Sequence, residues 1–254
     1  MATYKKRGGR PKTKVEQQTK IEEGSATAEV FNTLDEGANK AEQWVANNQK
    51  YIFGVIGLVA LAILGYLAYQ TYIQEPKEAK AMNEMFQAQN YWEQAMTAVE
   101  NDSLFNLALK GGNGQYGFEE IIAKYGGTDA GNLAKYYAGI AYLQTGQYQK
   151  AIESLDGFKA TDEILAPQAK GGIGDAFAAL GEFGDAMDYY KQAANLNTND
   201  YTTPKYLLKA GKSAIEAGNY SEAVSLLSQI KERFPESTFV QEADIFLGQA
   251  EVMQ

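Results

Sequence analysis

The chain has no cysteine and no histidine among its 254 residues. Without cysteine it can form no disulfide framework, thiolate nucleophile or thiolate-bound metal. Without histidine it lacks the commonest metal ligand and the side chain that titrates near neutral pH. The absence of cysteine fits a bacterial periplasm and a cytosol equally well.

The side chains left for catalysis are carboxylates, lysine, tyrosine and serine, and they form no dense cluster along the sequence. Catalysis needs positioned acids, bases or nucleophiles. Acid pairs such as Glu119 and Glu120 look like solvated helix faces. The glycine-rich residues 110–115 follow no predicted strand, unlike a phosphate-binding loop. We therefore expect no enzymatic activity, no cofactor and no metal site.

Residues 51–74 lack proline and any side chain that is charged at neutral pH, and they lie between Lys50 and Glu75. At about 1.5 Å per helical residue, roughly 20 apolar residues cross the ~30 Å hydrocarbon core of a bilayer. We predict one transmembrane helix over residues 50–74. Aromatic residues near its two ends suit the membrane interfaces. They are Trp44, Tyr51, Tyr69 and Tyr72.

The charge differs on the two sides of this segment. Residues 1–50 hold nine bases and seven acids, whereas residues 75–254 hold 14 bases and 25 acids. Positive charge on a short tail keeps that tail in the cytoplasm. We therefore expect a cytoplasmic N-terminus and a C-terminal domain across the membrane. The basic tail positions are Lys5, Lys6, Arg7, Arg10, Lys12 and Lys14.

Two further segments precede the span. Residues 1–27 form a basic tail that we expect to be disordered. Its ligand could be either anionic lipid or ribosomal RNA. Residues 28–49 predict an amphipathic juxtamembrane helix, because apolar residues recur every three or four positions. Those residues are Phe31, Leu34, Ala38, Ala41 and Val45.

A set of small and aromatic residues recurs in the acidic half at steps of 35 and 37 residues. Each unit predicts a helix, a glycine-containing turn and a second helix. The turn glycine can take the positive φ that ends the first helix. The recurring residues are Gly139, Gly174 and Gly211; Gly146, Gly181 and Gly218; Tyr148, Phe183 and Tyr220; and Ala151, Ala186 and Ala223.

This spacing resembles the tetratricopeptide repeat, with its period of about 34 residues and its Gly-x-Tyr-x-x-Ala turn. The resemblance implies a TPR-like α-solenoid over residues 75–254. Together with the single N-terminal transmembrane helix predicted above, it makes the expected fold all-α. We place repeat units at 132–166, 167–203 and 204–237, with a degenerate unit at about 76–131. A helix over residues 238–252 is expected to cap the last unit.

The concave side of such a solenoid, lined by the first helix of each pair, predicts a partner-binding groove. The mixture of aromatic, apolar and charged side chains suits a peptide or a partner's terminal segment, and neither a metal nor a nucleotide. Simple packing or exposure to water is the alternative for each residue taken singly. The groove positions are Tyr136, Ile140, Gln144, Asp175, Ala179, Leu208, Lys212 and Glu216.

The order of segments is similar to one family from about residue 40 onward. Residues 44–50 (WVANNQK), the span, residues 79–92 (AKAMNEMFQAQNYW) and the degenerate repeats resemble the YfgM-type ancillary subunit of the bacterial Sec translocon. The resemblance implies a single-pass inner-membrane protein with a periplasmic C-terminal domain. Its implied partners in secretion are the Sec channel and a membrane-anchored prolyl-isomerase-like chaperone.

Two other interpretations stay open. The chain could be a scaffold for another cell-envelope complex, which only the identity of its partner distinguishes. It could also be a regulatory membrane protein that sequesters a signalling factor, in which case the repeats would lie in the cytoplasm.

The apolar segment predicts an integral membrane protein. After an alkaline carbonate wash of membranes, we expect the full chain in the pellet. A chain of residues 75–254 should stay in the soluble fraction, because it lacks the apolar segment. A full-length chain that is a soluble monomer without detergent would contradict the predicted span.

Overall fold

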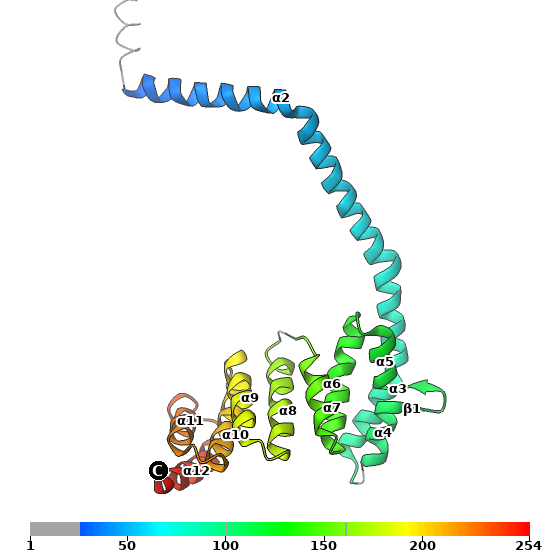
Figure 1. Ribbon diagram of the computed structural model, residues 1–254, viewed down its shortest axis with the longest axis vertical. Helices are drawn as coiled ribbons and strands as arrows, with labels where there is room; N and C mark the ends of the chain where they lie inside the picture. The colour runs from blue at the N-terminus through cyan, green and yellow to red at the C-terminus, as the bar shows by residue number, and fades with distance from the viewer. Residues whose placement is uncertain (1–25, 100, 161) are drawn as a thin grey trace, which may run out of the picture. The chain divides into compact units, whose positions relative to one another are not determined.

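The computed structural model describes residues 26–99, 101–160 and 162–254, and side-chain exposure from Gly37 onward (Figure 1). The fold is all-α, as predicted, apart from one short β-hairpin. The chain divides into two compact units between Tyr69 and Gln70, and each is described by itself. The basic tail positions 5–14 lie outside the described residues, as do the side chains of Phe31 and Leu34.

From residue 26 on, the first unit is a long helix, α2 (Ala26–Tyr69). It continues without a break past residue 49, where we predicted the amphipathic helix to give way to the span. No proline interrupts it, and Asn48 Nδ2 donates a hydrogen bond to the Trp44 carbonyl one turn earlier, at 2.7 Å. Within the described residues, one helix is long and apolar enough to cross a membrane. Its most apolar window has a mean hydropathy of 2.3, and none of that window is buried.

The second unit starts with a π-helical segment, η1 (Gln70–Gln74). The last five residues of the predicted span, 70–74, thus belong to the second unit. Gln74 Nε2 donates to the Gly127 carbonyl at 3.2 Å. This contact attaches the segment to the helical domain that follows.

In the described residues of the second unit, ten further helices follow one another from α3 to α12 (Figure 1). The predicted unit at 76–131 contains three of them and a hairpin of β1 (Gly111–Gly112) and β2 (Gln115–Tyr116). The helices are α3 (Glu75–Thr97), α4 (Asp102–Lys110), α5 (Phe118–Tyr125), α6 (Asp129–Gln144), α7 (Tyr148–Asp156), α8 (Leu165–Ala179), α9 (Phe183–Leu196), α10 (Thr202–Glu216), α11 (Tyr220–Arg233) and α12 (Val240–Met253).

The glycine-rich insertion at 110–115 forms the turn of this hairpin. Asn113 and Gly114 both have positive φ, 53° and 77°. Two such residues in succession give the turn type that matches the right-handed twist of two paired strands. The insertion is therefore a local excursion between α4 and α5.

Three helix pairs, α6/α7, α8/α9 and α10/α11, share one turn geometry. Gly146, Gly181 and Gly218 have φ of 72°, 80° and 75°. The residue after each glycine donates its backbone N–H to the carbonyl five residues earlier, at 2.8 to 2.9 Å. This is the Schellman ending, which satisfies the last carbonyls of the first helix.

A second glycine in each first helix allows close packing against its paired helix. A Cβ on Gly174 would lie 2.7 Å from the Tyr190 ring, and one on Gly211 would lie 2.6 Å from Leu227. Gly139 faces Leu155 in the same way. Since real Cβ atoms do not approach so closely, only glycine fits. Fully buried alanines such as Ala151, Ala186 and Ala223 add to the close contact in the core.

The helices begin slightly before the predicted unit starts at residues 132, 167 and 204. Helix α6 begins after Thr128, whose side chain accepts from the Gly131 N–H at 3.0 Å as an N-cap. Pro167 and Pro204 are the third residues of α8 and α10. A missing N–H costs nothing there, because the first-turn donors have no intrahelical partner.

The glycine positions predict opposite effects of one substitution. Gly211→Ala should lower the free energy of unfolding by about 1–3 kcal/mol, because the new methyl overlaps Leu227. Gly248→Ala, on α12, has no atom within 4 Å of the new Cβ and should raise it by about 0.5–1 kcal/mol through helix propensity. Urea unfolding monitored by circular dichroism measures both. Equal effects would contradict the packing described.

Candidate protein-interaction site

A hollow of about 310 Å³ opens among α8, α9, α10 and α12, and we call it the α10 hollow. Its walls combine aromatic and aliphatic side chains with lysine, glutamate, hydroxyl and amide groups. An apolar concavity with a few polar groups is the usual form of a ligand site. The lining residues are Ala178, Phe183, Tyr190, Lys209, Lys212, Ser213, Ile215, Glu216, Phe246 and Gln249.

Asp175 joins three helices beside this hollow. Its carboxylate on α8 accepts one hydrogen bond from the Tyr190 hydroxyl of α9 and one from Lys209 Nζ of α10, each at 2.5 Å. Tyr190 is only 4% exposed. Burial raises the pKa of Tyr190, and the Asp175 charge raises it further. The hydroxyl therefore stays a neutral donor, and Asp175 remains the acceptor that both neighbours need.

Lysine–carboxylate pairs connect successive helix pairs along the solenoid. Lys170 Nζ lies 3.2 Å from Asp156, Lys212 Nζ lies 2.9 Å from Glu242, and Lys191 pairs with Glu222. Such partly exposed pairs contribute only about 0–1 kcal/mol each. These pairs matter more for what the α10 hollow can bind. Both of its lysines, Lys209 and Lys212, already have carboxylate partners. A ligand that is simply acidic would have to displace them, so the hollow favours an uncharged or mixed peptide.

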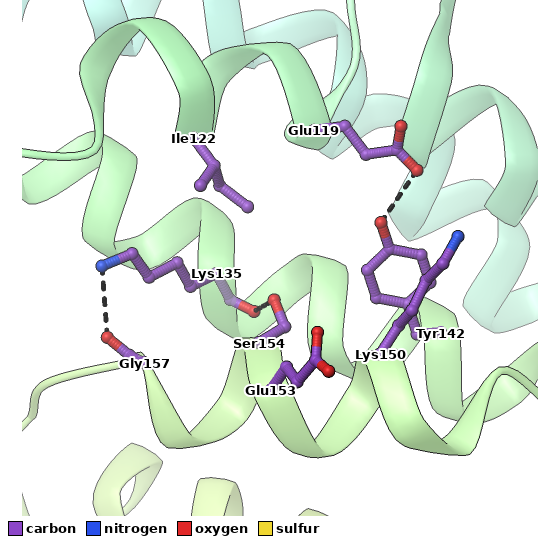
Figure 2. A pocket seen from close by; sticks show the side chains of 8 residues that line it. All are labelled: Glu119, Ile122, Lys135, Tyr142, Lys150, Glu153, Ser154 and Gly157. Atoms are coloured by element: carbon purple, nitrogen blue, oxygen red, sulfur yellow. Dashed lines mark hydrogen bonds between the residues drawn. The ribbon is translucent and has the colours of Figure 1, made fainter.

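A second hollow, of about 500 Å³, lies between α5, α6 and α7. Figure 2 shows Glu119 accepting from the Tyr142 hydroxyl, at 2.8 Å. Lys135 Nζ donates to the Gly157 carbonyl at 3.2 Å. The polar groups at its rim thus bond mainly to each other. Sequence reasoning missed this hollow, because its residues do not fall on the first-helix stripe used to find the groove.

The predicted groove residues divide into those at the α10 hollow, those that are exposed elsewhere, and those that are buried or half-buried. Lys212 and Glu216 line the α10 hollow, and Asp175 binds two residues that line it. Gln144 and Ala179 are exposed at the ends of α6 and α8, outside the linings of both hollows described here.

Two residues that we predicted to line an open groove are buried, so the prediction is wrong for them. A third is half-buried. Tyr136 and Leu208 are 7% and 4% exposed. The Tyr136 hydroxyl donates to Gln168 Oε1 at 2.7 Å, and burial raises the pKa of Tyr136 to about 12. Half-buried Ile140 packs against the cluster that contains Tyr136. The physical reason is that neighbouring helices cover both flanks of a first helix, so that part of its predicted open stripe becomes interior.

Tyr190 is the main functional candidate that the sequence reasoning missed. It lies 35 residues after Leu155 and 37 before Leu227, so it occupies the position that faces the helix glycine in each pair. A hydroxyl-bearing residue at an otherwise leucine position was the available signal. The predicted membrane-interface residues Trp44, Tyr51, Tyr69 and Tyr72 are all at least half exposed.

Metal chemistry finds no support in the part of the chain that the structure describes. There, no three or more Asp or Glu side chains are grouped so as to hold a metal ion. The acids near the hollows instead accept from tyrosine and lysine. The arrangement is suited to binding.

Removing the shared acceptor should destabilise the domain. We expect Asp175→Ala to lower the free energy of unfolding by about 1–3 kcal/mol, because it leaves the buried Tyr190 hydroxyl without an acceptor. Tyr190→Phe should lower the free energy of unfolding by less than Asp175→Ala does. In the Tyr190→Phe background, Asp175→Ala should have a smaller effect than it has in the wild type. Urea unfolding of the wild type, the two single variants and the double variant gives the coupling energy between Asp175 and Tyr190. Additive effects would contradict a shared bond.

Comparison with known proteins matches the helix pairs just described. Models of the tetratricopeptide repeat match residues 136–200 and 205–237. The TPR repeat-containing protein YpiA of Bacillus subtilis (strain 168) is 31% identical over 104 residues, which is 39% of this chain but only 23% of YpiA.

Solved structures agree on the fold. TPR-like repeats of a kinesin-light-chain-like protein from Podosopora anserina, and a variant of them, each align with a TM-score of 0.50 and 15% identity, covering 69% of this chain and 87% of theirs. At that identity the likeness shows the fold alone. The matches and the paired helices together show tetratricopeptide repeats over residues 136–200 and 205–237 of an all-α chain, which implies a protein-interaction module.

Proposed function

We propose that this chain is a non-enzymatic, membrane-anchored interaction module that serves as an accessory subunit of the bacterial Sec translocon. In this role it works with a periplasmic chaperone in protein secretion. The single observation that supports it best is the joining of two parts in one chain. A helix with an unburied 18-residue window of mean hydropathy 2.3 precedes, in the same chain, the tetratricopeptide repeats matched at residues 136–200 and 205–237.

The binding surface of this module is the α10 hollow. Its Phe183 and Phe246 walls offer apolar area, while Ser213 and Gln249 offer hydrogen-bonding groups. Because Lys209 and Lys212 already have carboxylate partners, a segment of mixed polarity fits better than an acidic one. An extended segment of the chaperone or of a secreted protein has this chemistry.

The membrane topology in this proposal follows from charge. Residues 1–50 have two more bases than acids, whereas residues 75–254 have 11 more acids than bases. A basic tail is retained in the cytoplasm, and a long acidic domain can cross. The protein would therefore be a single-pass protein of the bacterial inner membrane, with its repeats in the periplasm. The basic tail would contact anionic lipid or the ribosome.

Photocrosslinking in intact cells tests the partner. A photoreactive amino acid at Gln249, inside the α10 hollow, should give crosslinks to the Sec channel or to the chaperone. The same residue at exposed Glu236, between α11 and α12, is the matched control and should give at least several-fold less product. Crosslinks only to proteins of another envelope complex would replace the translocon role with a scaffold role there.

Protease treatment of intact spheroplasts tests the topology. If the repeats lie in the periplasm, added protease should digest them while the membrane is intact. Protection until lysis would place them in the cytoplasm and favour sequestration of a signalling factor instead.

A further inference from the structure

Helix α12 has the position pattern of a first helix. Its Gly248 lies 37 residues after Gly211, the same step that separates Gly211 from Gly174. It is thus the fourth member of the series of helix glycines that begins at Gly139. In the sequence analysis we expected this helix only to cap the preceding pair.

The glycine face of α12 is open, unlike the faces of its three counterparts. In the earlier pairs the second helix places Leu155, Tyr190 or Leu227 against the glycine, whereas Gly248 has no neighbouring atom within 4 Å of a Cβ built on it. Side chains beside it are also uncovered. Ile245 is 66% exposed, against 4% for its counterpart Leu208.

A second apolar residue completes this surface. Val252 is 89% exposed, against 7% for its counterpart Ile215 on α10. In an α-helix, residues 245, 248 and 252 lie on one face, because they are spaced by three and four positions. Ile245, Gly248 and Val252 form what we call the open α12 face.

Acidic residues lie beside the open α12 face, along one side of it. Asp244 and Glu251 stand where α10 has the buried residues Leu207 and Ala214. All the charged residues of α12 are acids, and Glu242 is the third. Asp244 already pairs with Lys231 of α11, 3.1 Å away. The open α12 face is therefore apolar, and Glu251 and the Asp244–Lys231 pair lie along its border.

We propose that the open α12 face binds an amphipathic helix of a partner protein. That helix places a large apolar side chain against Gly248, as the second helix does in the earlier pairs, and carries lysine or arginine opposite Glu251. A second copy of α12 fits less well, because it would bring acids against acids. This surface is separate from the α10 hollow and does not depend on the translocon role.

A peptide with the sequence of α11 is the direct probe. It is amphipathic, ends with Lys231 and Arg233, and contains the Leu227 that packs on Gly211. We would label a capped peptide of residues 219–235 with fluorescein and measure its polarisation with the full chain in detergent micelles. We expect saturable binding, weakened at least tenfold by Leu227→Ala in the peptide.

Variants of the protein locate the binding. Gly248→Trp should weaken peptide binding at least tenfold, and so should Asp244→Lys combined with Glu251→Lys. Gly184→Trp on α9 is the matched control, since a Cβ there also meets open space, and should leave binding unchanged. Thermal unfolding verifies that each variant is folded.

Two outcomes would overturn the proposal. One is a peptide that does not bind, or binds equally to the wild type and Gly248→Trp. The other is a chain that dimerises in sedimentation equilibrium and loses the dimer on Gly248→Trp, which would assign the face to a second copy.

Discussion

The close approach of paired helices at a glycine is the contact on which the repeat domain depends. At Gly139, Gly174 and Gly211 the space for a side chain is filled by Leu155, Tyr190 and Leu227 of the paired helix. Interiors pack as densely as organic crystals, so such contacts fix how far apart two helices lie. The turn glycines at positive φ then reverse the chain at once, and the alanine-rich core follows from the short distance between helices.

Polar contacts determine how the pairs are connected to each other and to the first helix of the domain. Glu78 of α3 accepts from the Asp129 and Ala130 N–H groups at 2.7 Å each, where the α6 N-terminus offers unpaired donors and positive dipole. Tyr125 donates to Glu84 of the same α3 at 2.7 Å. Glu119, which looked like part of a solvated helix face in the sequence, likewise accepts from the Tyr142 hydroxyl.

The same use of charge shapes what the surface can bind. Lysines of one helix pair reach carboxylates of the next, so positive groups near the α10 hollow are neutralised by the protein itself. A partner is then selected by apolar area and hydrogen bonding more than by its charge. The open α12 face differs from the α10 hollow, because acids there border exposed Ile245 and Val252. Two surfaces of different chemistry suit a module that holds more than one protein together.

The sequence by itself determined the long apolar helix, the all-α class, the three helix pairs and their glycine-containing turns. These features depend on local rules, namely hydropathy, spacing and the positive φ of glycine, which act within a few residues. It did not determine which first-helix residues are accessible. Tyr136 and Leu208 became interior, Tyr190 and Phe246 became walls of a hollow, and Gly248 stayed open although its spacing matches buried glycines. Only the tertiary structure decided these outcomes, because exposure depends on which neighbouring helix covers each face. For Tyr136 that helix is α8, where Gln168 lies 32 residues away along the chain.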